Sequence, residues 1–290
     1  MKARQTVLHY VESHASKSGT PTMGGLIFIF AALISSALFL WSQSFYAWMS
    51  LLVTTAFGVL GFLDDFIKIH FHQNEGLKPY QKLIGQTAIA LMIAFLIYYK
   101  LGGRLELFGW SFDISWGIIP FVVIVYLAVV NAVNLTDGLD GLAGGVSFVY
   151  LIFFGAILAL IGTSEGTSLA FATFALAGGV LAFLSVNTFP AKIFMGDTGS
   201  LALGGFIASV ALFSSKALLI PIMGLMFVLS ALSDIIQVAY FKHTKKRIFL
   251  MAPLHHHFEK KGVHENRIVT IYIIVTGLLS AVCLMLEILF

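Results

Sequence analysis

The stretch WGIIPFVVIVYLAVVNAVNLTDGLDGLAGG, residues 116 to 145, joins a long apolar run to a polar cluster. Two carboxylates, Asp137 and Asp140, and the amide of Asn134 stand where the apolar run ends. Charged side chains at the edge of a membrane span are rare unless they line a polar cavity. The stretch therefore predicts a membrane helix that ends at a site for a cation or a polyphosphate. The alternative is a loop whose polar residues only cap the next helix.

The composition of the chain is that of an integral membrane protein. Of its 290 residues, 59% are hydrophobic and only 11% are charged, and the mean hydropathy is +0.94. Soluble globular domains are about 45–50% apolar and about 25% charged, so this class is excluded. The single cysteine, Cys283, excludes a disulfide framework and a thiolate metal site.

Apolar runs long enough to cross about 30 Å of hydrocarbon set the expected architecture. The nine candidate spans cover residues 24–41, 46–63, 83–99, 116–133, 142–161, 168–187, 199–213, 217–240 and 268–289. No repeat, low-complexity tract or soluble segment interrupts them. Residues 1–290 are therefore expected to form one all-α polytopic membrane domain.

The basic residues predict the orientation of these spans, because lysine and arginine next to a span stay on the cytoplasmic side. Of the 17 lysines and arginines, all but Lys100, Arg104 and Lys216 fall in one set of loops. This bias places the N-terminus inside and, after nine crossings, the C-terminus outside. Residues 1–19 lack an apolar core, so no cleavable signal peptide is expected.

With this orientation, four polar clusters that are distant in sequence emerge on the cytoplasmic face. They are Asp64 with Asp65, Asn134 with Asp137 and Asp140, Asn187 with Asp197, and His255 with His256 and His257. The acids of the outer loops, Glu106, Asp113 and Glu165, show no comparable pattern. Solvated loops would not sort Asp, Asn and His to one side, so the clusters are expected to form one site.

The segments GFLDDFIKIH (61 to 70) and VNTFPAKIFMGDTGS (186 to 200) supply the chemistry for binding a metal and phosphate. Asp64 and Lys68 are four residues apart on a helix, where they can pair. The turn around Gly196 and Asp197 offers backbone amides and a carboxylate, which suits Mg²⁺ bound to a diphosphate. The alternative for Asp64 and Lys68 is a solvated ion pair at the membrane edge. Phe194, just before the turn, is either a membrane-interface aromatic, which the composition favours, or a platform on which a base stacks.

Two further segments allow a phosphate-binding and a structural interpretation. In KSGTPTMGG (17 to 25), Lys17 and Thr22 are candidate phosphate contacts, but Thr20 followed by Pro21 is also an ordinary helix start. In MAPLHHHFEKKG (251 to 262), the three histidines are expected to donate hydrogen bonds to a phosphate or a sugar. Zinc is the weaker alternative, because the HExxH pattern and a cysteine partner are lacking. Lys82, at the start of the third span, reads as an interfacial anchor.

Five motifs, in order and over nearly the whole chain, resemble those of the bacterial phospho-N-acetylmuramoyl-pentapeptide transferase family. This family lies within the polyprenyl-phosphate N-acetylhexosamine-1-phosphate transferase superfamily. The motifs are GTPTMGG (19 to 25), DDxxK (64 to 68), NLTDGLDG (134 to 141), FMGDTGS (194 to 200) and PLHHHFE (253 to 259). The family usually has ten spans, whereas nine are readable here, because this chain begins where a first span would have ended.

The resemblance implies the transfer of phospho-MurNAc-pentapeptide from UDP-MurNAc-pentapeptide to undecaprenyl phosphate, giving lipid I and UMP in peptidoglycan synthesis. It implies Mg²⁺ held by Asp197, Asp64 as the base that deprotonates the lipid phosphate, and Asp65 in support. The residues implied to bind substrate are Lys68, Asn134, Asp137, Gly138, Leu139, Asp140, Asn187, Phe194, His255, His256 and His257. Further candidates for substrate binding, from the residues themselves, are Lys17, Thr22, Lys82 and Gly196, and the role of Lys82 stays open. It also implies a homodimer in the bacterial inner membrane with a cytoplasmic active site and no nucleic-acid partner.

Two other functions remain as alternatives. One is a sister transferase that moves N-acetylglucosamine phosphate. The other is an ion-coupled secondary transporter, which would require acids near the bilayer midplane and an inverted repeat, and neither is seen in the sequence.

Overall fold

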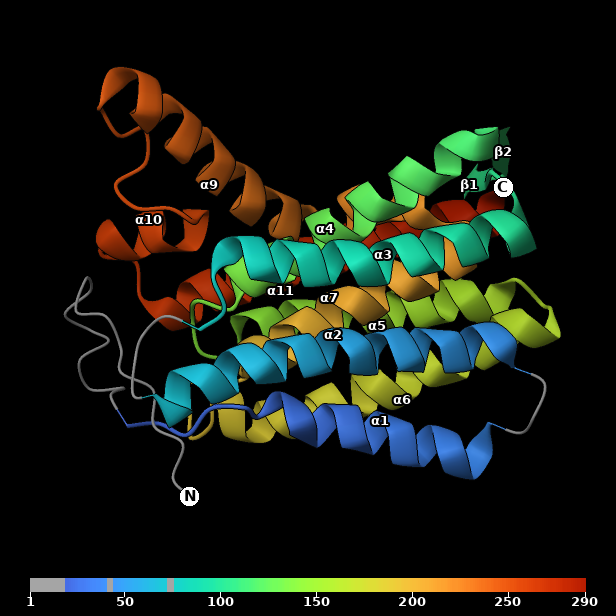
Figure 1. The fold of residues 1–290 in the computed structure, drawn as a ribbon, viewed down its shortest axis with the longest axis horizontal. Coiled ribbons are helices and arrows are strands. Elements are labelled where there is room, and N and C mark those ends of the chain that lie inside the picture. Colours follow the sequence, from blue (N-terminus) through green and yellow to red (C-terminus); the bar gives the residue numbers. More distant parts are fainter. Residues whose placement is uncertain (1–18, 41–43, 72–75) are drawn as a thin grey trace.

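The computed structural model describes residues 19–40, 44–71 and 76–290. Figure 1 shows a bundle of helices, most of which run along the long axis of the molecule. The long helices are α1 (Gly25–Phe39), α2 (Phe45–His70), α3 (Pro79–Leu101), α4 (Ile118–Thr136), α5 (Leu142–Leu160), α6 (Ser164–Asn187), α7 (Gly196–Phe213), α9 (Leu225–Thr244) and α11 (Glu265–Leu289). The short elements are η2 (Ser115–Gly117), η3 (Ala217–Leu219), α8 (Ile220–Met223), α10 (Leu254–Lys260), β1 (Arg104–Leu107) and β2 (Trp110–Asp113).

The chain is an all-α polytopic membrane protein, as predicted. Within the described residues, eight helices are long and apolar enough to cross a membrane. The first predicted span, residues 24–41, corresponds to α1, which has only 15 residues and is not among these eight. At 1.5 Å per residue α1 is about 22 Å long, shorter than the hydrocarbon core.

Helix α7 forms the centre of the bundle and packs against α2 and α4. Sixteen of its 18 residues, from Thr198 to Phe213, are buried. Small residues allow this close packing: a Cβ atom on Gly204 would lie 2.5 Å from the Cα atom of Val130. The N-terminus of α7 carries Asp197, so this candidate site residue is attached to the most deeply buried helix.

The predicted span over residues 217–240 is divided in the structure. Residues 217–223 form η3 and α8, with Pro221 in the first turn of α8, and a break at Gly224 precedes α9. Helix α9 then leans away from the other helices (Figure 1), and it continues to Thr244. The prediction of one span ending at residue 240 was therefore wrong, because proline and glycine interrupt the helix.

A β-hairpin connects α3 to α4 and was not predicted. Strands β1 and β2 pair antiparallel, with Arg104 opposite Asp113 and Leu107 opposite Trp110. The two turn residues, Phe108 and Gly109, both have positive φ angles of 46° and 78°. Positive φ at both positions is the geometry of a type I′ turn.

The hairpin end of the bundle contains an ion cluster made of Glu106, Lys216 and Glu287, which we call the hairpin cluster. The Lys216 ammonium lies 2.7 Å from the Glu287 carboxylate and 3.3 Å from that of Glu106. Lys216 and Glu287 are mostly buried. Lys216 thus links Glu106 in the hairpin to Glu287 near the end of α11, a contact that the sequence did not indicate.

Candidate active site

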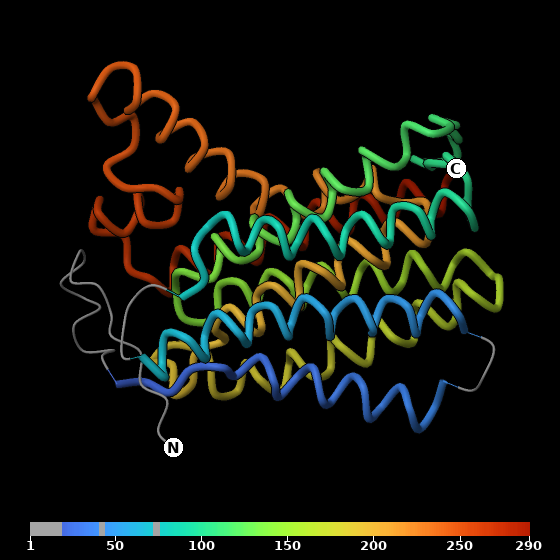
Figure 2. Tube along the Cα trace, in the orientation of Figure 1, coloured from blue at the N-terminus to red at the C-terminus, as the bar shows by residue number. Residues whose placement is uncertain are grey.

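The predicted polar clusters meet at the end of the bundle opposite the hairpin. Figure 2 shows the C-terminal ends of α2 and α4, the N-terminal ends of α3 and α7, and α10 at this end. Asp64, Asp65 and Asp197 each place an oxygen within 4.8 Å of the others, and we call them the carboxylate cluster. Asp64 and Asp65 are 1% and 3% exposed. Because each charge would be costly to bury alone, partners are required.

Two lysines supply these partners. The Lys68 ammonium lies 2.6 Å from Asp64 and 3.0 Å from Asp197, which confirms the predicted pairing of Asp64 with Lys68. The Lys82 ammonium lies 2.6 Å from Asp197 and 3.4 Å from Asp64. Lys82 therefore belongs to the site, whereas its position in the sequence reads as an interfacial anchor.

Asp65 fixes the start of α7. Its carboxylate accepts hydrogen bonds from the backbone N–H groups of Asp197 (3.2 Å) and Thr198 (2.9 Å) and from the Thr198 hydroxyl (2.7 Å). Gly61 permits this contact, since a Cβ atom there would lie 2.1 Å from the Asp197 carbonyl oxygen. The first N–H groups of a helix lack partners within the helix, so Asp65 acts as a cap from α2. Nothing in the sequence marked Gly61.

Asn134 holds Asp197 from the other side. Its side-chain amide donates to Oδ1 of Asp197 and to the Ser200 hydroxyl, both at 2.8 Å. The other Asp197 oxygen, Oδ2, faces Lys68 and Lys82. Asp197 thus connects α2, α3, α4 and α7, and its orientation is fixed by charge and hydrogen bonds.

The site has an excess of negative charge. Asp64, Asp65 and Asp197 contribute three carboxylates, against the two ammonium groups of Lys68 and Lys82. Burial, together with the carboxylates of Asp197, Asp65 and Asp140, raises the pKa of Asp137 to about 8. Asp137 therefore adds a neutral carboxyl group at pH 7, and one negative charge of the oxygen-lined site remains uncompensated, which fits a hard divalent cation such as Mg²⁺.

Asp140 and Asn187 hold the loop that leads into α7. The Asp140 carboxylate accepts the Ala191 N–H at 2.9 Å, and its own N–H donates to Glu265 at 2.6 Å. The Asn187 amide donates to the Ile193 carbonyl at 2.9 Å and accepts the Gly141 N–H at 3.2 Å. These contacts are structural, so nucleotide binding by both residues stays a prediction. Glu265 gave no local signal in the sequence.

The segment TPTMGG packs along the loop before α7. The Gly24 N–H donates to the Phe194 carbonyl at 2.9 Å, and the Phe194 N–H donates to Pro21 at 2.8 Å. A Cβ atom on Gly25 would lie 2.2 Å from the Cα atom of Gly199. The buried Thr22 hydroxyl has no hydrogen-bond partner within the described structure, and a Cβ atom on Gly196 would lie 2.8 Å from it. Lys17 lies outside the described residues.

The three histidines face different surroundings. A Cβ atom on Gly138 would lie 2.3 Å from the Nε2 atom of buried His255 and 3.0 Å from that of His256. Gly138 therefore brings these two rings against the NLTDGLDG loop, in which Leu139 is buried. His257 instead accepts the Leu250 N–H at 3.1 Å, and burial and then Lys261 lower its pKa. His257 thus contacts the loop before α10, and its contact with the substrate stays a prediction.

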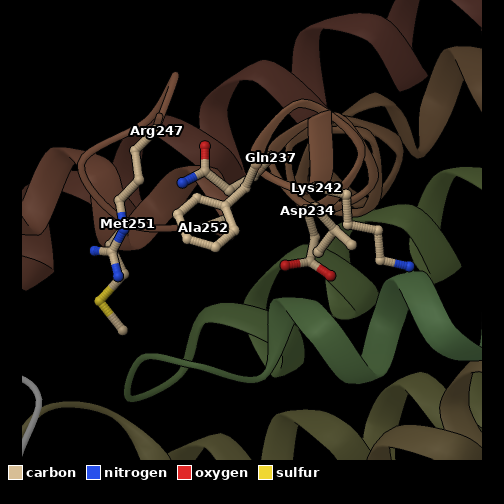
Figure 3. Close-up of a pocket in the computed structure, with 8 residues that line it drawn as sticks. Asp234, Gln237, Lys242, Arg247, Met251 and Ala252 are labelled. Atoms are coloured by element: carbon tan, nitrogen blue, oxygen red, sulfur yellow. The ribbon is translucent and has the colours of Figure 1, made fainter. Parts of the chain in front are cut away.

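A separate cavity of about 370 Å³ lies between the end of α9 and the loop that leads to α10 (Figure 3). Asp234, Gln237, Lys242, Arg247 and Met251 are among its lining residues. None of the lining residues belongs to the carboxylate cluster.

Comparisons with known proteins agree with this site. The family model described as glycosyl transferase family 4 matches residues 47–215, and signature 1 of phospho-N-acetylmuramoyl-pentapeptide-transferase matches residues 17–29. The phospho-N-acetylmuramoyl-pentapeptide-transferase of Clostridium perfringens is 46% identical over 267 residues, covering 91% of this chain and 83% of the relative. The enzyme of that name from Clostridioides difficile is 45% identical over 274 residues, covering 93% and 84%.

A third relative of that name, from Thermoanaerobacter pseudethanolicus, is 46% identical over 268 residues, covering 91% of this chain and 83% of the relative. Identity at this level over most of both chains establishes common ancestry and a common fold. The family predicted from the five motifs is confirmed. The chain is an enzyme of the phospho-sugar transferase class and belongs to the phospho-N-acetylmuramoyl-pentapeptide-transferase family.

Proposed function

We propose that this enzyme transfers phospho-MurNAc-pentapeptide from UDP-MurNAc-pentapeptide to undecaprenyl phosphate, giving lipid I and UMP. The observation that supports this most is the position of the carboxylate cluster with Lys68 and Lys82. These groups lie at the ends of membrane helices, where an acceptor from the bilayer and a donor from water can meet. We further propose that this end faces the cytoplasm, in the inner membrane of a bacterium, and that the enzyme is a homodimer.

The residues present fit Mg²⁺. Asp197 would hold the ion, with Asp64 and Asp65 beside it, because their oxygens lie close together and carry uncompensated charge. Mg²⁺ keeps few protein ligands and shares its remaining positions with phosphate and water. When bound, it supplies positive charge to the diphosphate oxygens of the donor.

Phosphoryl transfer requires positioning and charge neutralisation more than covalent help from the protein. An oxygen of the lipid phosphate attacks the phosphorus that carries the sugar. The bond from this phosphorus to the oxygen of the uridine-side phosphate breaks, and UMP leaves with its electron pair. Lys68 and Lys82 are placed to donate hydrogen bonds to phosphate oxygens, and Asp64 to take a proton from the lipid phosphate.

We assign the remaining predicted residues to the two ends of the donor. His255 and His256, which lie against Gly138, would contact the sugar and phosphates. Phe194 would stack on uracil, and Asn134, Asp137, Leu139 and Thr22 would line the same pocket. We favour direct displacement, and the trapping of a phosphorylated Asp64 or Asp65 would contradict it.

Membership in a transferase family removes the transporter alternative. The sister activity, transfer of N-acetylglucosamine phosphate, is tested by giving the purified enzyme each labelled UDP-sugar with undecaprenyl phosphate, with and without Mg²⁺. We expect a labelled lipid only from UDP-MurNAc-pentapeptide and only with Mg²⁺. A labelled lipid from UDP-N-acetylglucosamine instead would select the sister activity, and no product from either would refute the proposal.

A further inference from the structure

The residues that lead into α3 cover the Asp64 carboxylate. The Leu77 backbone N–H donates to Oδ1 of Asp64 at 2.8 Å. A Cβ atom on Gly76 would lie 2.5 Å from both the Cγ and Oδ1 atoms of Asp64 and 2.6 Å from Oδ2. The backbone at Gly76 therefore lies directly on the carboxylate, at a distance that only glycine permits.

The Asp64 carboxylate is held in place by burial and by its ion pairs, so it cannot move aside for a larger residue at position 76. Its side chain is 1% exposed, and its two oxygens are paired with Lys68 at 2.6 Å and Lys82 at 3.4 Å. Lys68 stands on α2 and Lys82 on the first turn of α3, so the carboxylate is held from two helices. A side chain at position 76 must displace either the backbone or the carboxylate, and both movements break the Leu77 hydrogen bond.

We infer that Gly76 and Leu77 are positioning residues that act through Asp64. They fix the orientation of its carboxylate beside Asp197 with a backbone hydrogen bond. This inference rests on the proposed function, in which Asp64 receives a proton from the acceptor. A backbone donor is fixed by the chain, whereas the lysine ammonium groups can move to phosphate oxygens when substrates bind. The Leu77 N–H thus keeps Asp64 in place after the lysines have exchanged partners.

The first test measures the hydrogen bond without any reaction. Hydrogen exchange of the peptide that contains Leu77 is compared in the wild type and in Asp64→Ala. We expect the Leu77 amide to exchange about tenfold faster in the variant, because a hydrogen bond to a charged acceptor is lost. Unchanged exchange would overturn the inference, and it would do so whether or not the proposed reaction occurs.

The second test uses Gly76→Ala, with Gly178→Ala as the matched control. Gly178 is exposed on α6, and a Cβ atom there meets nothing within 4 Å. We expect kcat to fall at least about tenfold in Gly76→Ala, with the KM for the UDP-sugar within about twofold of the wild type. Equal kcat values in the two variants would overturn the inference while leaving the proposed function intact.

If Gly76→Ala does not fold, the exchange measurement on Asp64→Ala still decides the structural half of the inference. A wild type that makes no labelled lipid, but whose Leu77 amide depends on Asp64, would refute the proposed function alone. The two failures are therefore distinguishable.

Discussion

Lys82 offers a sharp test of the site, because its two interpretations predict opposite results. As an interfacial anchor, Lys82 would be replaceable by a neutral polar residue at little cost. In the structure, however, its ammonium lies 2.6 Å from Asp197 and 3.4 Å from Asp64. We therefore consider Lys82→Gln, with Lys78→Gln as control, since Lys78 lies one helical turn earlier and is exposed.

The size of the effect follows from the lost charge-assisted hydrogen bond. Such bonds contribute about 1.5–3 kcal/mol, which corresponds to a fall in kcat of roughly 10- to 150-fold if the bond is made in the transition state. Removing a positive charge beside Asp197 also makes the cluster more negative. Divalent ions should then bind more tightly, so the Mg²⁺ concentration for half-maximal rate should fall while kcat also falls.

The assay is the formation of labelled lipid from labelled UDP-MurNAc-pentapeptide over a series of Mg²⁺ concentrations. Lys78→Gln should match the wild type in both quantities. If Lys82→Gln behaves as Lys78→Gln does, Lys82 is an anchor and the proposed role of its ammonium is wrong. A fall in kcat together with a higher Mg²⁺ concentration for half-maximal rate would also contradict the electrostatic argument.

Three further predictions concern stability. Lys216→Met should destabilise the protein by about 3–5 kcal/mol, because two carboxylates of the hairpin cluster lose their buried cation. The measurement is the thermal midpoint, which should be lower than that of the control Lys192→Met, in which the replaced lysine is exposed. The thermal midpoint of the metal-free protein should fall as the pH rises from about 4 through 8, because the raised pKa of Asp137 lets the folded state hold a proton that the unfolded chain releases. Asp137→Asn should flatten this pH dependence. Gly25→Ala should reduce the yield of folded protein, measured by size-exclusion chromatography, because the added Cβ atom would lie 2.2 Å from backbone. The control Gly277→Ala should match the wild type, because its Cβ atom would lie 3.6 Å from the nearest side chain.

Much of the fold could be predicted from hydropathy because apolar length alone decides which segments cross a bilayer. Residues 46–63 and 142–161 fall within or within one residue of α2 and α5. The division near Gly224 and the hairpin at residues 104–113 were not predicted. Both depend on local backbone geometry, which hydropathy does not report: residues 217–240 are apolar throughout, and residues 104–113 lie in the connection between two spans.

The candidate site was predictable to the extent that charge is expensive in a membrane. Asp64, Asp65 and Asp197 were marked by this cost, and the structure brings them together. The sequence position of Lys82 favoured an interfacial anchor, because a lysine at a helix end usually reaches water there, and its role in the site stayed open. Which oxygen it faces depends on how α3 packs, and the sequence around Lys82 does not contain this information.

Glycines whose role depends on the absence of a side chain were the hardest to predict from the sequence. Gly61 and Gly76 have no chemistry of their own, and their roles follow only from the backbone or carboxylate that lies 2.1 to 2.5 Å from an added Cβ. Glu265 similarly looks like an ordinary acid in the first turn of α11, yet it accepts the Asp140 N–H from 125 residues away. Long-range contacts of this kind are fixed by tertiary packing.

The central claim is that segments distant in sequence form one Mg²⁺-dependent site for phospho-sugar transfer around Asp197. The most direct test compares Asp197→Asn with Asp113→Asn, an exposed acid of the hairpin, in the transfer of labelled phospho-MurNAc-pentapeptide to undecaprenyl phosphate at saturating Mg²⁺. We predict that Asp197→Asn loses at least about 100-fold in kcat, in line with the removal of a principal electrostatic group, and that Asp113→Asn retains wild-type activity. Equal activity of the two variants would contradict the account.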